Sequence, residues 1–480
     1  MTHSPTNTNP AVKKGAELEL TLEKFADRGK SLVKVAGYVV FVAGAVPGDR
    51  VRAKVFKRRR SFAEARLIEV LEPSSLRTEA RCEYFSDCGG CKWQHVRYDV
   101  QLEMKRQAVA DALTHQGGMN LDELGIEVNP TLGADEVYFY RNKMEFSFSA
   151  GRWLTQWEID SGNEFDKDFA LGLHVPGRFD KVLDLQACYL QSEWSARLVN
   201  SVRAFAKNQG WEPWDVRKHT GYLRHLVIRT PAYTGEKMVV LVTSREEQDR
   251  IRSFADFLQS EFSDVTTFVN TINSTPAQTA FGERMITVYG PGVVHDRLGP
   301  YTFEIAPNAF FQTNTKQAEK LYEVVAEFAD FRQSDLVYDL YCGAGTISIF
   351  ISNHVKRVVG VELIDEAVAN AKTNASANNV ENCTFVAGDM LKLFTPEFVD
   401  ERGRPDVVIV DPPRAGMHPK VVKQIARLKP ERLVYVSCNP QTQARDIAQL
   451  KEAYRVQAVQ PVDLFPHTHH VECVIKLVAQ

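Results

Sequence analysis

Short apolar runs alternate with amphipathic stretches throughout the C-terminal part of the chain. The apolar runs are Leu336–Leu340, Val358–Val361, Thr384–Val386, Val407–Val410 and Leu433–Val436. Helical-period stretches, such as Asp365–Asn378 and Gln441–Tyr454, lie between them. Strands that alternate with helices of this length form βαβ units, and parallel sheets of this kind bind ligands at the carboxyl ends of their strands. The pattern predicts an α/β, Rossmann-like domain over residues 300–480.

A different pattern marks residues 12–75. Arg50, Arg52 and Lys54 alternate with apolar residues at 51, 53 and 55, so a strand would carry three cations on one face. We expect the next four cations, Lys57–Arg60, in a hairpin loop. Short strands separated by turns predict a small β-barrel of the oligonucleotide-binding (OB) type.

Residues 76–299 have the mixed pattern of an α+β domain. They begin with clustered cysteines and a helical stretch over 96–114, which could dock on the C-terminal domain. Strand-like runs follow at Glu145–Phe148, Leu226–Arg229 and Met238–Val242. The polar segment Gly151–Lys167 is expected to be an exposed loop or hairpin.

Composition limits the class of protein. The 480 residues are 44% hydrophobic and 25% charged, as in ordinary globular proteins. No apolar run is long enough to cross a membrane, and Met1–Pro10 lacks the apolar core of a secretory signal. Eight cysteines are too few for a disulfide scaffold. We therefore expect a cytoplasmic protein with no membrane partner.

Charge is unevenly distributed along the chain. The formal net charge is −3, yet residues 1–75 contain 14 Lys and Arg against 8 Asp and Glu. A basic module on a mildly acidic body favours binding of a polyanion such as RNA. The alternative is a solvated charged face.

A glycine-containing loop follows the first strand of the C-terminal domain. Gly343 and Gly345 would let the backbone approach a ligand closely, but Ser348 stands where a dinucleotide fingerprint has its third glycine. Glu362 ends the next strand, where its carboxylate could accept bonds from both ribose hydroxyls of an adenosine. Asp389 ends the third strand, near the expected adenine, although it could equally be a turn-capping aspartate. The trio resembles an S-adenosylmethionine site, and an NAD site is the alternative.

Three further side chains follow later strands of the same sheet. Asp411 precedes two prolines that stiffen the loop. Cys438 lies at a strand end before a helix, whose N-terminus would favour the thiolate. Glu472 begins the last strand, as either a functional carboxylate or a sheet-edge one. Arg414 replaces the aromatic residue of amino-methyltransferase loops, which argues against amine methylation.

A cysteine and a carboxylate suit methylation of uracil at C5. This carbon is a poor nucleophile until a thiolate adds to C6 and makes C5 enolate-like. A base must then remove the C5 proton before the cysteine can leave. The reaction needs one covalent nucleophile and one general base, and Cys438 and Glu472 fit these roles.

Five motifs in order resemble the RNA uracil-C5 methyltransferase family. They are Phe310–Asn314, Asp339–Gly345, Asp411–Arg414, Ser437–Pro440 and His469–Glu472. The resemblance implies that Gln312, Tyr341, Glu362 and Asp411 contact S-adenosylmethionine. It also implies that Cys438 is the nucleophile and Glu472 the base. Thr346 occupies a position where asparagine is common in the family.

Cys82, Cys88 and Cys91 form a tight group of soft ligands, and Cys188 is the one other cysteine outside the catalytic region. Thiolates in such a group suit zinc or an iron–sulfur cluster about equally. The ribosomal-RNA branch of the resembling family carries a 4Fe–4S cluster at this pattern, which favours iron. Such a cluster would be structural, since methyl transfer needs no electron.

The N-terminal module resembles a TRAM domain over Thr21–Ser74. Together with the cysteine pattern, it points to methylation of 23S ribosomal RNA, and not of DNA. The alternatives are the same reaction on transfer RNA and a non-catalytic RNA-binding protein that keeps the fold. Two cationic segments, Tyr140–Lys143 and Leu223–His225, resemble RNA-facing family segments or are solvated surface. Tyr189 and Gly151–Lys167 depart from the family pattern.

Overall fold

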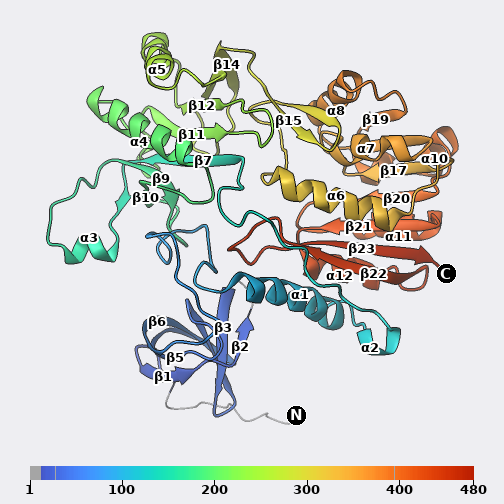
Figure 1. The fold of residues 1–480 in the computed structure, drawn as a ribbon, viewed down its shortest axis with the longest axis horizontal. Coiled ribbons are helices and arrows are strands. Elements are labelled where there is room, and N and C mark those ends of the chain that lie inside the picture. Colours follow the sequence, from blue (N-terminus) through green and yellow to red (C-terminus); the bar gives the residue numbers. More distant parts are fainter. Residues whose placement is uncertain (1–11, 27–28, 394) are drawn as a thin grey trace.

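The computed structural model describes residues 12–26, 29–393 and 395–480 and contains three large sheets (Figure 1). The expectation that Met1–Pro10 carries no secretory signal concerns residues outside this described part. Within the described residues, no helix is long and apolar enough to cross a bilayer.

The N-terminal sheet has the strand order β1-β5-β6-β4-β3-β2. Its strands are β1 (Glu17–Thr21), β2 (Lys24–Ala26), β3 (Lys30–Val35), β4 (Tyr38–Ala43), β5 (Arg50–Arg58) and β6 (Phe62–Glu72). Val51, Ala53 and Val55 of β5 are buried, as their spacing predicts. They belong to a small apolar core of their own.

The cations on the other face of β5 are neutralised by carboxylates from neighbouring strands. Arg50 pairs with Glu19 and Glu72, Arg52 with Glu69, and Lys54 with Glu17. The predicted hairpin loop over Lys57–Arg60 is wrong at its start, because Lys57 and Arg58 extend β5 and Lys57 pairs with Glu64 of β6. The net charge of this strand face is therefore less positive than its own cations alone would suggest.

The central sheet has the order β14-β13-β12-β11-β7-β9-β10-β8. Its strands are β7 (Lys143–Ser149), β8 (Arg152–Trp153), β9 (Ala170–His174), β10 (Val182–Asp184), β11 (Leu223–Arg229), β12 (Met238–Thr243), β13 (Thr267–Ile272) and β14 (Arg284–Tyr289). Helices α4 (Glu193–Asn208) and α5 (Gln248–Glu261) bury their apolar stripes in an aromatic-rich core with this sheet.

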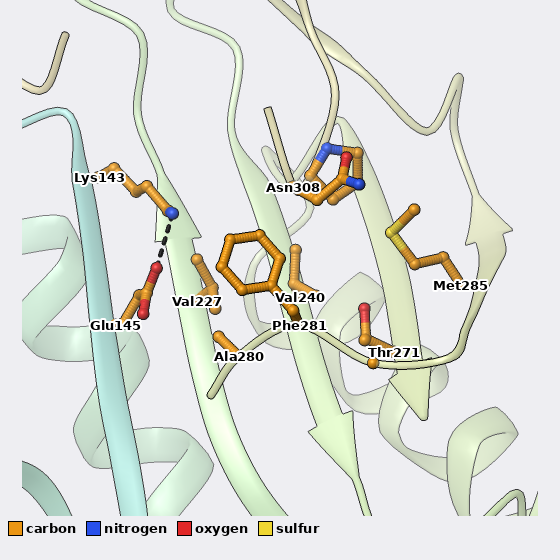
Figure 2. Close-up of a pocket in the computed structure, with 11 residues that line it drawn as sticks. Lys143, Glu145, Val227, Val240, Thr271, Ala280, Phe281, Met285 and Asn308 are labelled. Carbon is orange, nitrogen blue, oxygen red and sulfur yellow. Dashed lines mark ion pairs between the residues drawn. The ribbon is translucent and has the colours of Figure 1, made fainter. Parts of the chain in front are cut away.

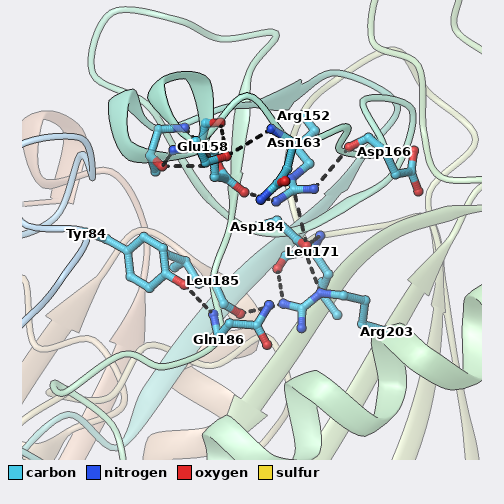
Figure 3. Close-up of polar contacts among 12 residues, drawn as sticks. Tyr84, Arg152, Glu158, Asn163, Asp166, Leu171, Asp184, Leu185, Gln186 and Arg203 are labelled. Atoms are coloured by element: carbon cyan, nitrogen blue, oxygen red, sulfur yellow. Dashed lines mark hydrogen bonds and ion pairs between the residues drawn. The ribbon is translucent and has the colours of Figure 1, made fainter.

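The polar segment 151–167 contains β8 and a short helix, α3 (Gln156–Asp160), and projects from the body of the protein (Figure 1). Thr155 and Glu158 form a capping box at the start of α3. Figure 3 shows Arg152 contacting Glu158 and the backbone of Asp166, which closes the segment on itself.

Helix α1 (Tyr98–His115) lies along the C-terminal domain, next to α12 and β22 (Figure 1). Val109, Ala112 and Leu113 of α1 join the apolar core that lies against one face of the C-terminal sheet. A short helix, α2 (Leu121–Leu124), follows.

The C-terminal sheet has the order β19-β18-β17-β20-β21-β23-β22. Its strands are β17 (Leu336–Leu340), β18 (Arg357–Glu362), β19 (Cys383–Ala387), β20 (Val407–Val410), β21 (Arg432–Ser437), β22 (Tyr454–Val462) and β23 (Glu472–Ala479). The first five are parallel, and β23 is antiparallel to both of its neighbours. The predicted Rossmann-like fold, with a TRAM-type β module and a mixed α+β middle, is confirmed.

Helices cover both faces of this sheet. They are α6 (Thr315–Ala329), α7 (Thr346–Phe350), α8 (Asp365–Ala377), α9 (Met390–Leu393), α10 (Pro396–Arg402), α11 (Pro419–Leu428) and α12 (Pro440–Ala448). The prediction of a helix over Gln441–Tyr454 is wrong at its end, because residues 449–453 form turns and Tyr454 pairs with Ala479 in the sheet. A hairpin of β15 (Val294–Leu298) and β16 (Tyr301–Ile305) spans residue 300, where the sequence predicts the start of the C-terminal domain. The hairpin packs on the apolar core of this domain.

Candidate active site

Cys438 and Glu472 lie at adjoining strand ends. Cys438 follows β21, and Glu472 is the first residue of β23, whose Cys473 pairs with Ser437. The register therefore brings positions 438 and 472 to the same edge of the sheet, and the thiol and the carboxyl group interact electrostatically.

The environment of Cys438 disfavours its thiolate. Burial, with smaller contributions from Glu472 and Asp411, raises the pKa of the thiol to about 11, while Arg414 opposes them. The expectation that a helix N-terminus favours the thiolate is therefore wrong for the protein without RNA. Helix α12 does begin next to Cys438, but burial and two carboxylates raise the pKa of the thiol.

Glu472, Asp411 and Asp339 are three desolvated carboxyl groups, and the first two interact electrostatically with the Cys438 thiol. Burial raises the pKa of Glu472 to about 8 and those of Asp411 and Asp339 to about 7. Asp411 also raises the pKa of Glu472, and Asp339 that of Asp411, so the three are neighbours. Part of Asp411 remains accessible, but its carboxyl group is desolvated. Groups with these values exchange protons near neutral pH.

Tyr322 of α6 lies beside the same carboxyl groups, and sequence reasoning missed it. The residue is buried, and its hydroxyl lies 2.9 Å from the Thr346 hydroxyl. Burial raises its pKa, and Asp411, Asp339 and Glu472 each add to this effect. A phenol on the buried face of an otherwise apolar helical stripe was the available signal. Thr346 thus has a partner within the protein.

The loop after β17 has the backbone that the glycines predict. Tyr341, Gly343 and Gly345 all have positive φ, of 69°, 54° and 75°. A Cβ on Gly343 would meet no atom within 4 Å, whereas one on Gly345 would lie 2.8 Å from the Phe385 ring. Gly345 is therefore needed for packing, and Gly343 leaves its backbone open to a ligand.

Glu362 lies against this loop. One carboxylate oxygen accepts a hydrogen bond from the Gly343 N–H at 3.1 Å, and the other accepts from the Leu363 and Ile364 N–H groups. Leu363 and Ile364 are exposed, at 65% and 58%. An anchored carboxylate beside exposed apolar side chains suits a ligand with a ribose and an aromatic base.

Asp389 follows Gly388, whose N–H donates to the Glu362 carbonyl at 2.8 Å, and Gln312 lies in the segment before α6. The Asp389 carboxylate accepts a bond from the Leu391 N–H at 2.9 Å, so the turn-capping alternative describes part of its role. The backbone carbonyl of Gln312 accepts from the Asn142 side chain at 3.0 Å. Asn142 thus ties the Gln312 loop to the central domain, and the Gln312 side chain does not make this contact.

The four cysteines proposed as ligands converge in the structure. Electrostatic interactions couple Cys82 and Cys91 to each other and to Cys88 and Cys188, and they couple Cys188 to Cys88. All four are free thiols whose pKa values are raised by burial. Within the described part of the chain, no group of three or more His, Cys, Asp or Glu side chains is arranged to hold a metal ion.

The loop that carries Cys82, Cys88 and Cys91 contacts both the C-terminal domain and another segment of the central domain. The Lys92 and Trp93 N–H groups donate to the His467 carbonyl at 2.7 and 3.0 Å, five residues before Glu472. On the other side, the Tyr84 hydroxyl accepts from the Gln186 N–H at 3.2 Å (Figure 3). The cysteine loop therefore braces the segment that leads to Glu472.

Two other features of the central domain contain none of the residues predicted for catalysis or donor binding. Figure 2 shows a shallow hollow on the central sheet around Phe281, and no residue named for catalysis or donor binding lines it. Arg224, predicted either to face RNA or to be solvated, does neither. It is 1% exposed, stacks on Trp214 and donates to the carbonyls of Asn273 and Thr275.

Comparison with known proteins places this site in a family context. The profile of the tRNA (Uracil-5-)-methyltransferase family matches residues 230–480, and that of the TRAM domain matches residues 11–68. A protein named an uncharacterized RNA methyltransferase from Bacteroides thetaiotaomicron is 42% identical over 94% of this chain and 99% of its own length. A similarly named protein from Chlorobaculum tepidum is 42% identical over 96% of both chains.

One solved structure is similar over nearly the whole molecule. It is the tRNA (uracil-54, C5)-methyltransferase of Pyrococcus abyssi in complex with S-adenosyl-L-homocysteine. The TM-score is 0.74 at 27% identity, and the match covers 96% of this chain and 100% of the other.

Proposed function

Because this chain belongs to the tRNA (uracil-5-)-methyltransferase family and carries a TRAM domain, we propose that it methylates C5 of uridine in 23S ribosomal RNA. S-adenosylmethionine is the methyl donor, and Cys438 forms a transient covalent bond with the pyrimidine. The observation that carries the proposal is the meeting of Cys438 and Glu472 at one edge of the sheet, beside the glycine loop.

The reaction divides between these two side chains. The Cys438 sulfur bonds to C6, and the electrons of the C5–C6 double bond move toward C5 and O4. C5 then takes the methyl group from the donor sulfonium, and the C–S bond of the donor breaks. Glu472 removes the C5 proton, the double bond re-forms and the thiolate is expelled. The products are 5-methyluridine, S-adenosylhomocysteine and one proton.

The carboxyl groups near Cys438 accept the protons that are released in this cycle. Cys438 is protonated at neutral pH, so its proton must leave before the sulfur can attack. Asp411 is the neighbouring acceptor that leaves Glu472 free for the C5 proton. Arg414 opposes the carboxylates at the thiol and favours the thiolate.

The donor would bind against the glycine loop. Glu362 would accept hydrogen bonds from the ribose hydroxyls, and Leu363 and Ile364 would cover the adenine. The donor site is completed by Gln312, Tyr341, Asp389 and Asp411. Thr346 contributes indirectly, through the contact of its hydroxyl with Tyr322. The P. abyssi enzyme, which was solved in complex with S-adenosyl-L-homocysteine, supports S-adenosylmethionine as the donor.

Cys82, Cys88, Cys91 and Cys188 would hold a 4Fe–4S cluster. The chemistry of the donor set supports this proposal, because all four are free, desolvated thiols that interact electrostatically and a 4Fe–4S cluster takes one thiolate at each iron. The cluster would be structural and would require a reducing compartment such as the cytoplasm. Protein purified without oxygen should absorb broadly near about 400 nm. A colourless protein that contains zinc would contradict this assignment.

Transfer RNA is the second candidate substrate. The P. abyssi tRNA enzyme matches this chain over its full length, so the accessory domains alone do not exclude tRNA. The test is to map 5-methyluridine in RNA from cells with and without this protein. Loss of the mark from 23S RNA supports the proposal, loss from tRNA supports the second candidate, and no change excludes both. A non-catalytic RNA-binding protein would also leave every mark intact.

A further inference from the structure

Arg81 lies among three aromatic rings beside the cysteine loop. Its guanidinium carbon is 5.3 Å from the ring centre of Tyr138, 5.0 Å from that of Phe139 and 4.8 Å from that of Tyr189. Arg81 is exposed, and among the described residues no carboxylate forms an ion pair with it. An exposed cation over aromatic faces keeps its charge available to an anion.

Phe139 is held in an unfavourable backbone conformation. Its φ is 59°, in the left-handed region that bulky residues avoid, and 37% of the residue is exposed. Its N–H donates to the Tyr189 carbonyl at 2.8 Å, which fixes the strained turn. A strained turn that holds a large ring at the surface indicates a use for that ring.

This aromatic group lies between the cysteines and the catalytic loop. Arg81 precedes Cys82, and Tyr189 follows Cys188. The neighbouring Tyr138 ring packs on His467 with centroids 4.4 Å apart, and the Tyr140 hydroxyl donates to the Pro466 carbonyl. Both contacts are to the segment that ends at Glu472.

We propose that Arg81, Phe139 and Tyr189 bind one unpaired nucleobase of the RNA substrate, on the strand that carries the target uridine. The base stacks on the exposed aromatic and guanidinium surface, and the Arg81 charge attracts the adjacent phosphate. This inference rests on the proposed function, because it assumes an RNA substrate opened around its target base.

The test compares Arg81→Ala, Arg81→Lys and Phe139→Asn with wild type. Asparagine removes the ring and tolerates a positive φ, so the strained turn can persist. Trp157→Ala, which removes an exposed ring on α3, and Arg252→Ala, which removes an exposed cation on α5, are matched controls. The probe is total RNA from cells lacking this protein, and the readouts are KM for RNA, kcat and the salt dependence of RNA binding.

Arg81→Ala and Phe139→Asn should each raise KM for RNA about tenfold, with kcat and the KM for S-adenosylmethionine unchanged. Arg81→Ala should also lower the salt slope of binding by about one, whereas Phe139→Asn and Arg81→Lys should keep it. A purely structural clamp would lower the thermal midpoint and kcat with no change in salt slope. That result, or wild-type KM values in both variants, overturns the inference.

Failure of the proposed function looks different. Wild-type protein would then transfer no methyl group to the probe RNA, whatever the variants do. In that case, filter-retention measurements of RNA affinity still test the stacking site. An unchanged RNA affinity in both variants would reject the inference independently of the proposed function.

Discussion

The ammonium group of Lys105 donates to the Asp463 carboxylate across 2.5 Å, and neither side chain is accessible to solvent. Lys105 lies on α1, and Asp463 begins the loop that ends at Glu472. The Tyr98 hydroxyl and the Phe465 N–H also donate to Asp463. This buried pair therefore fixes the base-bearing loop to a helix from another part of the chain.

Lys105→Met should lower both stability and kcat. It leaves a buried carboxylate without its counter-ion, which costs about 3–5 kcal/mol of unfolding free energy. Chemical denaturation measures this loss, and steady-state kinetics measure kcat. The double variant Lys105→Met/Asp463→Leu should regain part of the stability but not kcat, because the loop has lost its anchor. Wild-type kcat in the double variant would show that the pair does not position Glu472.

Glu362→Gln should weaken binding of S-adenosylmethionine about 10- to 100-fold, because hydrogen bonds to a charged acceptor contribute about 1.5–3 kcal/mol. Calorimetric titration of the protein without RNA measures this change. Glu366→Gln, four residues away on α8, is the matched control and should bind the donor normally. Equal affinity in the two variants would remove Glu362 from the donor site.

Activity should rise with pH between 6 and 8. Cys438 must lose its proton to attack C6, and Glu472 must be ionised to accept the C5 proton. Both pKa values are raised, to about 11 and about 8, so both active forms are depleted as pH falls. The measurement is kcat/KM for RNA at saturating donor, which reports the groups of the free enzyme. A flat profile over this range would contradict these ionisation states.

Glu472→Gln should stabilise the inactive protein at alkaline pH. The folded-state pKa of Glu472 is raised, so the stability present below its unfolded-state pKa is lost as pH rises toward 8. Glutamine stays neutral and avoids this loss, by about 1–3 kcal/mol at pH 8 and less at pH 5. Urea unfolding at both pH values measures the difference. An equal effect at the two pH values would mean that ionisation is not its cause.

The strands of the C-terminal domain were predictable because fully buried strands leave continuous apolar runs. Val407–Val410 has identical bounds in sequence and structure. Positions 438 and 472 were predictable as strand ends. Their relation to Asp339 and Asp411 was not, because burial and mutual repulsion depend on strand order.

Contacts between distant residues left no local signal. The acids that neutralise Arg50 and Lys54 lie on other strands, so a face that looked basic is largely paired. Lys105 and Asp463 have no local sequence feature that marks them as buried, although neither side chain is accessible to solvent. The prediction of a thiolate at Cys438 was wrong for the same reason, because the carboxylates near it come from separate strands.

The central claim is that a sulfur–carbon bond forms and that Glu472 permits its release. Glu472→Gln, mixed with RNA from cells lacking this protein and S-adenosylmethionine, should give a protein–RNA adduct that survives a denaturing gel. The adduct should carry the donated methyl group, and Cys438→Ala/Glu472→Gln should give none. A Glu472→Gln protein that completes methylation at the wild-type rate, or an adduct that persists without Cys438, would contradict the account.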